Sequence, residues 1–255
     1  MISKIKKKLY PIKRMLTEGR PNTGVIGGKI DGAYWGKTRP YLRQFQYKSS
    51  NREWQQLMMY NEIMFKLHDI PGDVAEFGVA GGISFVSFVR INEILERGRE
   101  GLEKRSFYGF DSFEGLPELS DEDYSDKEPV PQMQKGGFVD TEGFPQLKAF
   151  ADKHDNVHLV KGWFDKSLPE FFTKNPHVSF SLIHVDCDLY DSTKSVLELC
   201  WPRLNPGGVI LFDEINQPNY PGETVAFVEY FENKPDTYTM HRVKSMPAKR
   251  YLVKK

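Results

Sequence analysis

The fold is decided by residues 73–84, which read DVAEFGVAGGIS. The apolar run that ends at Phe77 predicts a short buried strand, and the glycines after it allow a tight turn into a helix that begins at Ile83. The spacing of these glycines differs from the G-x-G-x-x-G of dinucleotide-binding proteins. Glu76 stands just before the turn, where a carboxylate would repel a pyrophosphate but suits a ligand that carries an ammonium group. The alternative is a tight turn with a solvated Glu76.

Strands and helices alternate from this stretch to the end of the chain. Apolar runs predict strands at residues 74–77, 107–110, 157–160, 180–185, 209–212, 237–241 and 250–253. Helical patterns predict helices at residues 83–97, 147–153, 192–204 and 223–231. Such alternation favours an α/β fold with a Rossmann-like, doubly wound and mostly parallel sheet, whose ligands bind beyond the carboxyl ends of the strands.

A further helix is expected before the first strand. Ser50 and Glu53 fit a capping box at its start. Its apolar stripe consists of Trp54, Leu57, Met58, Ile63 and Leu67. We therefore divide the chain into an N-terminal extension with a cap helix, residues 1–67, and an α/β domain, residues 68–255. Within that domain, residues 118–141 form an acid-rich insertion, and insertions of this length are usually functional lids or disordered.

Composition excludes several classes of protein. The 255 residues carry 35 basic and 35 acidic side chains, so no nucleic-acid partner is expected. No apolar run approaches the ~20 residues of a membrane span. Cys187 and Cys200 are too few for a disulfide framework or a zinc site. The lysine-rich N-terminus lacks the apolar stretch of a secretory signal, which predicts a cytoplasmic protein. The alternative for those lysines is contact with an anionic surface.

The second and third strands end in residues that suit a nucleoside. Asp111 ends the second strand, where an acid accepts hydrogen bonds from ribose hydroxyls, although a turn cap is the alternative. Trp163 follows the third strand and would pack against adenine or anchor a loop. Ser84, after the glycine turn, is suited to hold an anionic group. Glu76 and Asp111 together describe a ligand with an amino acid at one end and a nucleoside at the other, as in S-adenosylmethionine.

Acidic residues follow the fourth and fifth strands. Asp186 and Asp188 end the fourth strand, and Asp213 with Glu214 ends the fifth. If these strands are neighbours, Asp186, Asp213 and Glu214 converge, and clustered carboxylates repel one another unless they are protonated or neutralised by a cation. Oxygen ligands of this kind suit Mg²⁺. The alternative is that some of these acids cap the following helices. His184 lies inside the apolar fourth strand and is expected to be a core residue.

These residues resemble a known family. The chain from about residue 73 to residue 231 is similar to class I S-adenosylmethionine-dependent methyltransferases, and more narrowly to the macrocin O-methyltransferase family of sugar O-methyltransferases in natural product biosynthesis. The blocks that carry the resemblance are residues 76–84, YGFDSFEGLP at 108–117, KGWFDKSLP at 161–169, HVDCDLYDST at 184–193 and LNPGGVILFDE at 204–214.

The resemblance implies roles for matching positions and a seven-stranded sheet. Asp188 would be the general base, and Mg²⁺ would be held by Asp186, Asp213 and Glu214. The residues that would contact S-adenosylmethionine are Glu76, Gly78, Val79, Gly82, Ser84, Asp111, Ser112, Trp163 and Asp186. Two positions depart from related patterns. Leu189 stands where catechol-type enzymes place a lysine, and Glu214 stands where Asp or Asn is more usual.

The predicted activity is therefore Mg²⁺-dependent transfer of a methyl group from S-adenosylmethionine to a hydroxyl of a sugar or other polyhydroxylated small molecule. The acceptor would be a small molecule or a glycan, and the chain could form a homo-oligomer. Two alternatives remain at this point: a nicotinamide-dependent oxidoreductase on a Rossmann fold, and a non-catalytic module that binds a cofactor or a glycan. The glycine spacing and Glu76 argue against the first, and the joint presence of Asp186, Asp188 and Asp213 argues against the second.

Overall fold

The computed structural model describes residues 47–96, 104–126 and 130–255. The chain divides into two compact units, residues 1–53 with 96–102 and residues 54–95 with 103–255. The lysine-rich N-terminus belongs to the first unit and lies outside the described residues, as do residues 127–129 of the insertion. The second unit contains the sheet and every candidate site residue. The predicted boundary between residues 67 and 68 stays a prediction.

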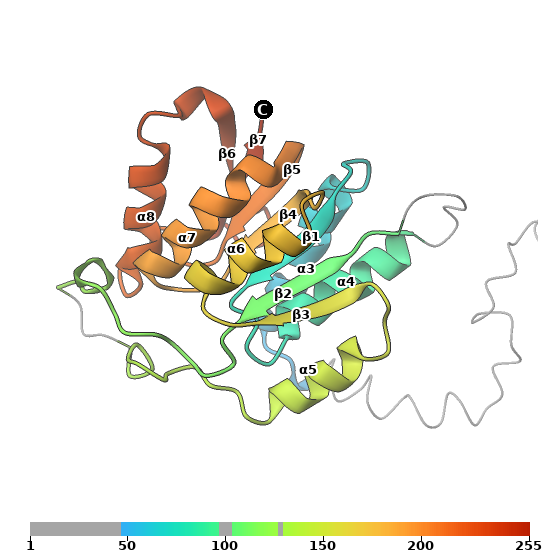
Figure 1. Ribbon diagram of the computed structural model, residues 1–255, viewed down its shortest axis with the longest axis horizontal. Helices are drawn as coiled ribbons and strands as arrows, with labels where there is room; N and C mark the ends of the chain where they lie inside the picture. The colour runs from blue at the N-terminus through green and yellow to red at the C-terminus, as the bar shows by residue number, and fades with distance from the viewer. Residues whose placement is uncertain (1–46, 97–103, 127–129) are drawn as a thin grey trace, which may run out of the picture. The chain divides into compact units, whose positions relative to one another are not determined.

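The second unit is built on one seven-stranded sheet, which confirms the predicted fold class (Figure 1). Its strands are β1 (Asp73–Phe77), β2 (Phe107–Asp111), β3 (Val157–Lys161), β4 (Phe180–Val185), β5 (Leu204–Phe212), β6 (Tyr238–Arg242) and β7 (Arg250–Lys254). The order is β3-β2-β1-β4-β5-β7-β6. Neighbouring strands among β1–β5 pair in parallel, and β7 runs antiparallel to both β5 and β6. The order reverses between β1 and β4, which is where ligands bind in such sheets.

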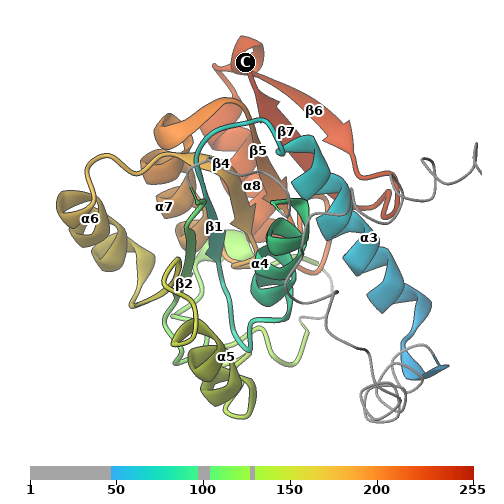
Figure 2. The same ribbon diagram turned by 90° about the vertical axis from the view of Figure 1, so that its right-hand side faces the viewer.

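Helices cover both faces of the sheet (Figures 1 and 2). One face packs against α6 (Phe164–Lys174), α7 (Tyr190–Cys200) and α8 (Pro221–Phe231). The other packs against α3 (Asn51–Lys66), α4 (Ile83–Leu95) and α5 (Gly143–Ala151). β4 is buried along its whole length, as a central parallel strand requires. Short 3₁₀ helices lie at Asp121–Asp123, Trp201–Arg203 and Pro235–Thr237.

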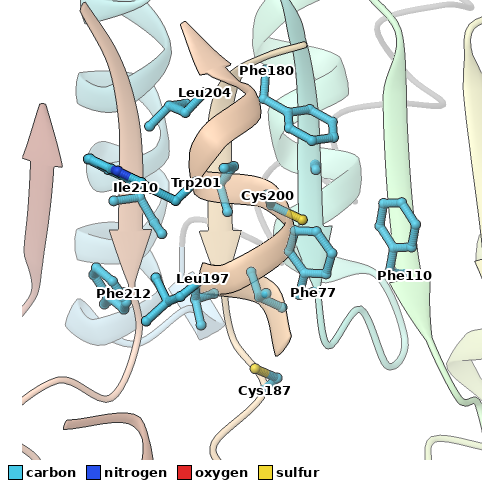
Figure 3. Close-up of a cluster of buried hydrophobic side chains, with 14 of the residues drawn as sticks. Phe77, Phe110, Phe180, Cys187, Leu197, Cys200, Trp201, Leu204, Ile210 and Phe212 are labelled. Atoms are coloured by element: carbon cyan, nitrogen blue, oxygen red, sulfur yellow. The ribbon is translucent and has the colours of Figure 1, made fainter. Parts of the chain in front are cut away.

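The core on the α7 side is apolar and well filled (Figure 3). Phe77, Ile210 and Phe212 extend from their strands into the same cluster as Leu197 and Trp201. Phe77 stacks on Phe110 with ring centroids 4.8 Å apart. Both cysteines are free and buried, in agreement with the sequence-based expectation that they form no disulfide. Phe77, Phe110, Val185 and Phe212 of this cluster directly precede the strand-end residues that form the candidate site.

The structure confirms the helix predicted before the first strand but changes part of its buried face. In α3 the capping box is present, because Ser50 Oγ accepts the Glu53 N–H at 3.2 Å. The predicted stripe, however, included Trp54 and Met58, which are 40 and 58 % exposed. The residues of α3 that are buried are Met59, Tyr60, Ile63 and Met64. Ile63 and Leu67 of the predicted stripe are fully buried as expected, so the prediction was wrong only for the exposed members Trp54 and Met58. In the first half of the helix the buried face includes Tyr60, which packs edge-on against Phe88 of α4.

Other boundaries shifted because tertiary packing overrode local signals. Helix α6 was not predicted from the sequence, and Pro169 lies inside it. The segment 205–208, NPGG, was expected to end a helix but lies within β5. Helices α4, α5 and α7 end at Leu95, Ala151 and Cys200, earlier than expected.

Among the described residues, no helix combines the length and the apolar character that a membrane crossing requires.

Candidate functional site

The candidate site lies along the carboxyl ends of five adjacent strands, and the register of the sheet sets its order. Phe77 pairs with Phe110 on one side and with Val185 on the other, and Val185 pairs with Phe212. The next residue along each of these strands is Gly78, Asp111, Asp186 or Asp213. These four positions therefore lie side by side in the order 111, 78, 186, 213. Backbone hydrogen bonds extend the pairing, with the Asp186 N–H donating to Phe77 O at 2.9 Å and the Asp213 N–H to Val185 O at 3.0 Å.

Gly78 allows this close approach. Its φ is +92°, a conformation that L side chains rarely adopt. A Cβ atom at this position would also collide with the main-chain oxygen of Asp186. The glycine is thus required twice, for its backbone conformation and for the contact between the ends of β1 and β4. Gly82 also has a positive φ, of +83°, and Val79 is buried under the turn.

Glu76 is fully buried beneath the glycine turn. Its Oε1 accepts a hydrogen bond from Ser84 Oγ at 2.6 Å. Its Oε2 lies 3.3 Å from Nδ1 of His184 yet has no hydrogen-bond donor among the described residues. The rings of Tyr60 and Phe88 pack edge-on against the His184 ring. His184 is a core residue as expected, but neither of its ring nitrogens has a hydrogen-bond partner in the described part of the chain.

Asp111 and its neighbours form a second polar group at the end of β2. Asp111 Oδ2 accepts the Ala80 N–H at 2.8 Å, and Oδ1 accepts the Phe113 N–H at 2.6 Å. Each carboxylate oxygen retains a second lone pair for a ligand. Ser112 is buried and uses its hydroxyl within the loop, where it donates to Gly115 O at 2.8 Å. Trp163, at the start of α6, is 40 % exposed and lies beyond the neighbouring strand end.

The acids after β4 and β5 form one interacting cluster around a lysine. Burial and the charge of Asp213 raise the pKa of Asp186 well above its ordinary value. Burial alone would raise the pKa of Asp213 as well, but the Lys249 ammonium, 2.7 Å from Asp213 Oδ2, outweighs it and lowers the pKa. Burial and Asp213 raise the pKa of Glu214 to about 8, against the opposing effect of Lys249 at 3.6 Å. The cluster holds more carboxylates than one ammonium can neutralise.

Asp188 combines a strained backbone with a raised pKa. Its φ is +61°, which is uncommon for a residue other than glycine. The conformation belongs to a tight turn in which the Leu189 N–H donates to Cys187 O at 2.6 Å. Burial, together with the charge of Asp213, raises the pKa of Asp188 to about 7. At neutral pH this carboxyl group is therefore poised between its protonated and ionised forms.

Sequence reasoning missed two members of this cluster. Glu223, in the first turn of α8, is fully buried; its Oε1 accepts the Glu214 N–H at 2.8 Å, and burial raises its pKa. Lys249 precedes β7 and is 4 % exposed. For Lys249 the available signal was its position directly before the strand expected at residues 250–253. For Glu223 the sequence holds no signal, because an acid in the first turn of a helix is ordinary.

One further group contains potential metal ligands. Glu76, His184 and Asp186 each offer an atom within 4.8 Å of the others, among the described residues. This group shares only Asp186 with the predicted set of Asp186, Asp213 and Glu214. Mg²⁺ prefers oxygen ligands, so the predicted set suits it better than one that includes a buried imidazole.

Where the structure describes it, the insertion at residues 118–141 makes defined contacts with this site. Asp123 is buried, and its Oδ1 accepts the backbone N–H of Tyr190, the first residue of α7, at 2.7 Å. Its Oδ2 accepts the Ser120 N–H and hydroxyl, each at 2.9 Å. Leu116 and Met133 pack against Leu189, next to Asp188. Asp123 therefore caps α7 from a distant part of the chain and ties the insertion to the turn that holds Asp188.

Asp123→Ala should loosen the insertion and destabilise the protein by about 1–3 kcal/mol, because a buried N–H of Tyr190 loses its acceptor. Urea unfolding measures the loss, and limited proteolysis should show faster cleavage between residues 118 and 141. Asp121→Ala is the matched control, since Asp121 is an exposed acid of the same 3₁₀ turn. Equal stability of the two variants would contradict the anchoring role.

A family model matches most of this chain. The model described as macrocin-O-methyltransferase (TylF) matches residues 51–243, which include every candidate site residue except Lys249. Among structures, that titled "Crystal Structure of CalS11, Calicheamicin Methyltransferase" has the same fold, with a TM-score of 0.73, 24 % sequence identity and coverage of 97 % of this chain and 91 % of that one.

Curated relatives match over a shorter stretch. The 8-demethyl-8-(2,3-dimethoxy-alpha-L-rhamnosyl)-tetracenomycin-C 4'-O-methyltransferase of Streptomyces olivaceus is 32 % identical over 148 residues, which are 57 % of this chain and 53 % of that protein. The mycinamicin III 3''-O-methyltransferase of Micromonospora griseorubida is 28 % identical over 150 residues, 57 % of this chain and 56 % of the relative. The chain thus spans about half the length of the curated relatives it matches.

Proposed function

The chain belongs to the macrocin O-methyltransferase family, and from this premise we propose that it transfers a methyl group from S-adenosylmethionine to a hydroxyl of a sugar or other polyhydroxylated small molecule, with Mg²⁺ as the metal. The observation that carries the proposal is the row of Asp111, Gly78, Asp186 and Asp213 along adjacent strand ends, beside Asp188. The names of the two curated relatives support a sugar hydroxyl as the acceptor.

The residues at the ends of β1 and β2 fit S-adenosylmethionine. Among the described residues, Glu76 Oε2 is a buried acceptor without a donor, and the ammonium group of the methionine portion would satisfy it. Asp111 has free lone pairs for the ribose hydroxyls, and the glycine at position 78 lets the ends of β1 and β4 approach each other next to it. Ser84, Val79, Gly82, Ser112 and Trp163 complete the proposed cofactor site.

The acids at the ends of β4 and β5 fit a divalent cation. Asp186, Asp213 and Glu214 offer only oxygen atoms, and the raised pKa values of Asp186 and Glu214 reflect burial together with negative charge that Lys249 does not neutralise. A divalent cation would relieve that repulsion. These three residues would hold Mg²⁺, which when bound supplies Lewis-acid stabilisation of an acceptor oxygen and a template for its orientation.

The protein's own contribution to the reaction is positioning and removal of a proton. S-adenosylmethionine supplies a methyl group on a sulfonium, and an unionised alcohol is a poor nucleophile for it. Asp188 accepts the hydroxyl proton on its carboxylate; a base with a pKa near 7 is suited to this at neutral pH. The left-handed backbone conformation of Asp188 sets the orientation of that carboxylate. Residues in such sparsely populated conformations cluster at functional sites. The strand ends hold cofactor and acceptor in one orientation, which avoids entropy loss in the transition state.

Binding and turnover measurements test the proposal. Calorimetric titration with S-adenosylhomocysteine should show saturable binding, whereas NADH should not bind. Incubation with labelled S-adenosylmethionine, Mg²⁺ and a panel of rhamnosylated acceptors should give labelled, alkali-stable ethers. Binding of S-adenosylhomocysteine without transfer to any hydroxylated acceptor would favour a non-catalytic module, and binding of NADH alone would favour an oxidoreductase.

A further inference from the structure

We infer that Lys249 is a built-in counter-ion of the acidic cluster that competes with the divalent cation for Asp213 and Glu214, and thereby sets how tightly the metal is held. The inference rests on the proposed metal site. It concerns a residue outside the segment that matches the family model, which ends at residue 243.

The sheet places Lys249 in the cluster. In the antiparallel pair of β5 and β7, Phe212 is opposite Arg250. Because the two strands run in opposite directions, the residue after Phe212 is opposite the residue before Arg250, so Asp213 faces Lys249. The lysine thus extends the row of strand-end residues by one strand, next to Asp213.

The ammonium is held by several contacts rather than by solvent. Lys249 Nζ donates to Asp213 Oδ2 at 2.7 Å and to the main-chain oxygen of Asp213 at 2.5 Å, and lies 3.6 Å from Glu214 Oε1. The side chain is 5 % exposed. Among the described residues it is the lysine or arginine that pairs with the carboxylates of this cluster. Removal of this ammonium without a substitute cation would leave Asp213 as an uncompensated buried charge.

A metal ion on the same carboxylates would compete with this ammonium. Mg²⁺ binds oxygen at 2.0–2.1 Å, and Asp213 Oδ2 already accepts the ammonium. Two cations on one carboxylate repel each other strongly where water is excluded. Lys249 must therefore move away from Asp213 or weaken the metal's hold on it. The positive charge of Lys249 also reduces the repulsion between these acids before any metal binds, so that folding does not depend on the ion.

The test compares Mn²⁺ binding by the wild-type chain and by Lys249→Met, which keeps most of the length of the side chain and removes its charge. Electron paramagnetic resonance of free Mn²⁺ gives the dissociation constant without any need for turnover. We expect Lys249→Met to bind Mn²⁺ at least about tenfold more tightly. Its melting temperature should fall below that of the wild type in EDTA and recover with Mn²⁺. Lys249→Arg, which keeps the charge, should bind close to the wild-type value.

Lys244→Met is the matched control, because Lys244 is an exposed lysine of the same β6–β7 loop; its Mn²⁺ affinity should not change. Equal or weaker Mn²⁺ binding by Lys249→Met would overturn the inference. The inference would also be overturned if both Lys249→Met and Lys249→Gln stay unfolded at saturating Mn²⁺. Absence of Mn²⁺ binding in every protein would overturn it together with the proposed metal site. Titration of the same samples with S-adenosylhomocysteine distinguishes these failures from failure of the proposed methyltransferase activity.

Discussion

Replacing Asp188 by Asn should lower kcat for methyl transfer by about 10²–10⁴-fold, the usual contribution of a general base. Asn is close to Asp in shape and keeps the turn at this position, because both residues tolerate a positive φ. It cannot accept the proton of the acceptor hydroxyl. Binding of S-adenosylhomocysteine should stay close to that of the wild type, since Asp188 is not among the proposed cofactor residues.

The pH profile separates loss of a base from a structural effect. The carboxyl of Asp188 must be ionised to accept a proton, and burial raises its pKa to about 7 in the metal-free protein. The kcat/KM of the wild type should therefore fall as pH drops below about 7, with the fall displaced to lower pH when a cation binds nearby. In Asp188→Asn this acid limb should disappear. Asp191→Asn, an exposed aspartate in the first turn of α7, serves as the control. Near-normal turnover of Asp188→Asn at neutral pH would assign proton removal to another group.

Replacing Asp186 by Ala should abolish both methyl transfer and divalent-cation binding. Asp186 lies between Gly78 and Asp213 in the row of strand ends, so its carboxylate is central to the proposed metal site. Loss of several kcal/mol of transition-state stabilisation corresponds to a decrease in kcat/KM of at least about 10³-fold. Wild-type protein in EDTA should be equally inactive, and excess Mg²⁺ should restore the wild type but not the variant.

Two controls keep the Asp186 result interpretable. Circular dichroism should show an intact fold, because removal of one carboxylate from a cluster of mutually repelling acids relieves unfavourable charge. Asp165→Ala removes an exposed aspartate of α6 and should leave transfer unchanged. Transfer that survives in EDTA, in either the wild type or Asp186→Ala, would show that the reaction does not need a metal.

The positions of the strands along the chain could be predicted from sequence because each is a short apolar run between turn residues. The run at residues 180–185 coincides with β4, and the turn at residues 78–82 follows β1 as expected. Helix faces were harder to predict. Trp54 and Met58 fit the period of a helix as well as Met59 and Tyr60 do, and only contact with α4 and the sheet determines which pair is buried.

By itself, then, the sequence determined the strand–helix alternation and the positions of Glu76, Asp111, Asp186, Asp188 and Asp213 at strand ends, because apolar periodicity and turn chemistry are local. Only the tertiary structure decided that Lys249 meets Asp213, 36 residues away, and that Asp123 caps the helix that begins at Tyr190, 67 residues away. Such partners are joined by strand register and by packing between distant segments. No local pattern encodes either, so the charge balance of the site becomes apparent only once the chain has folded.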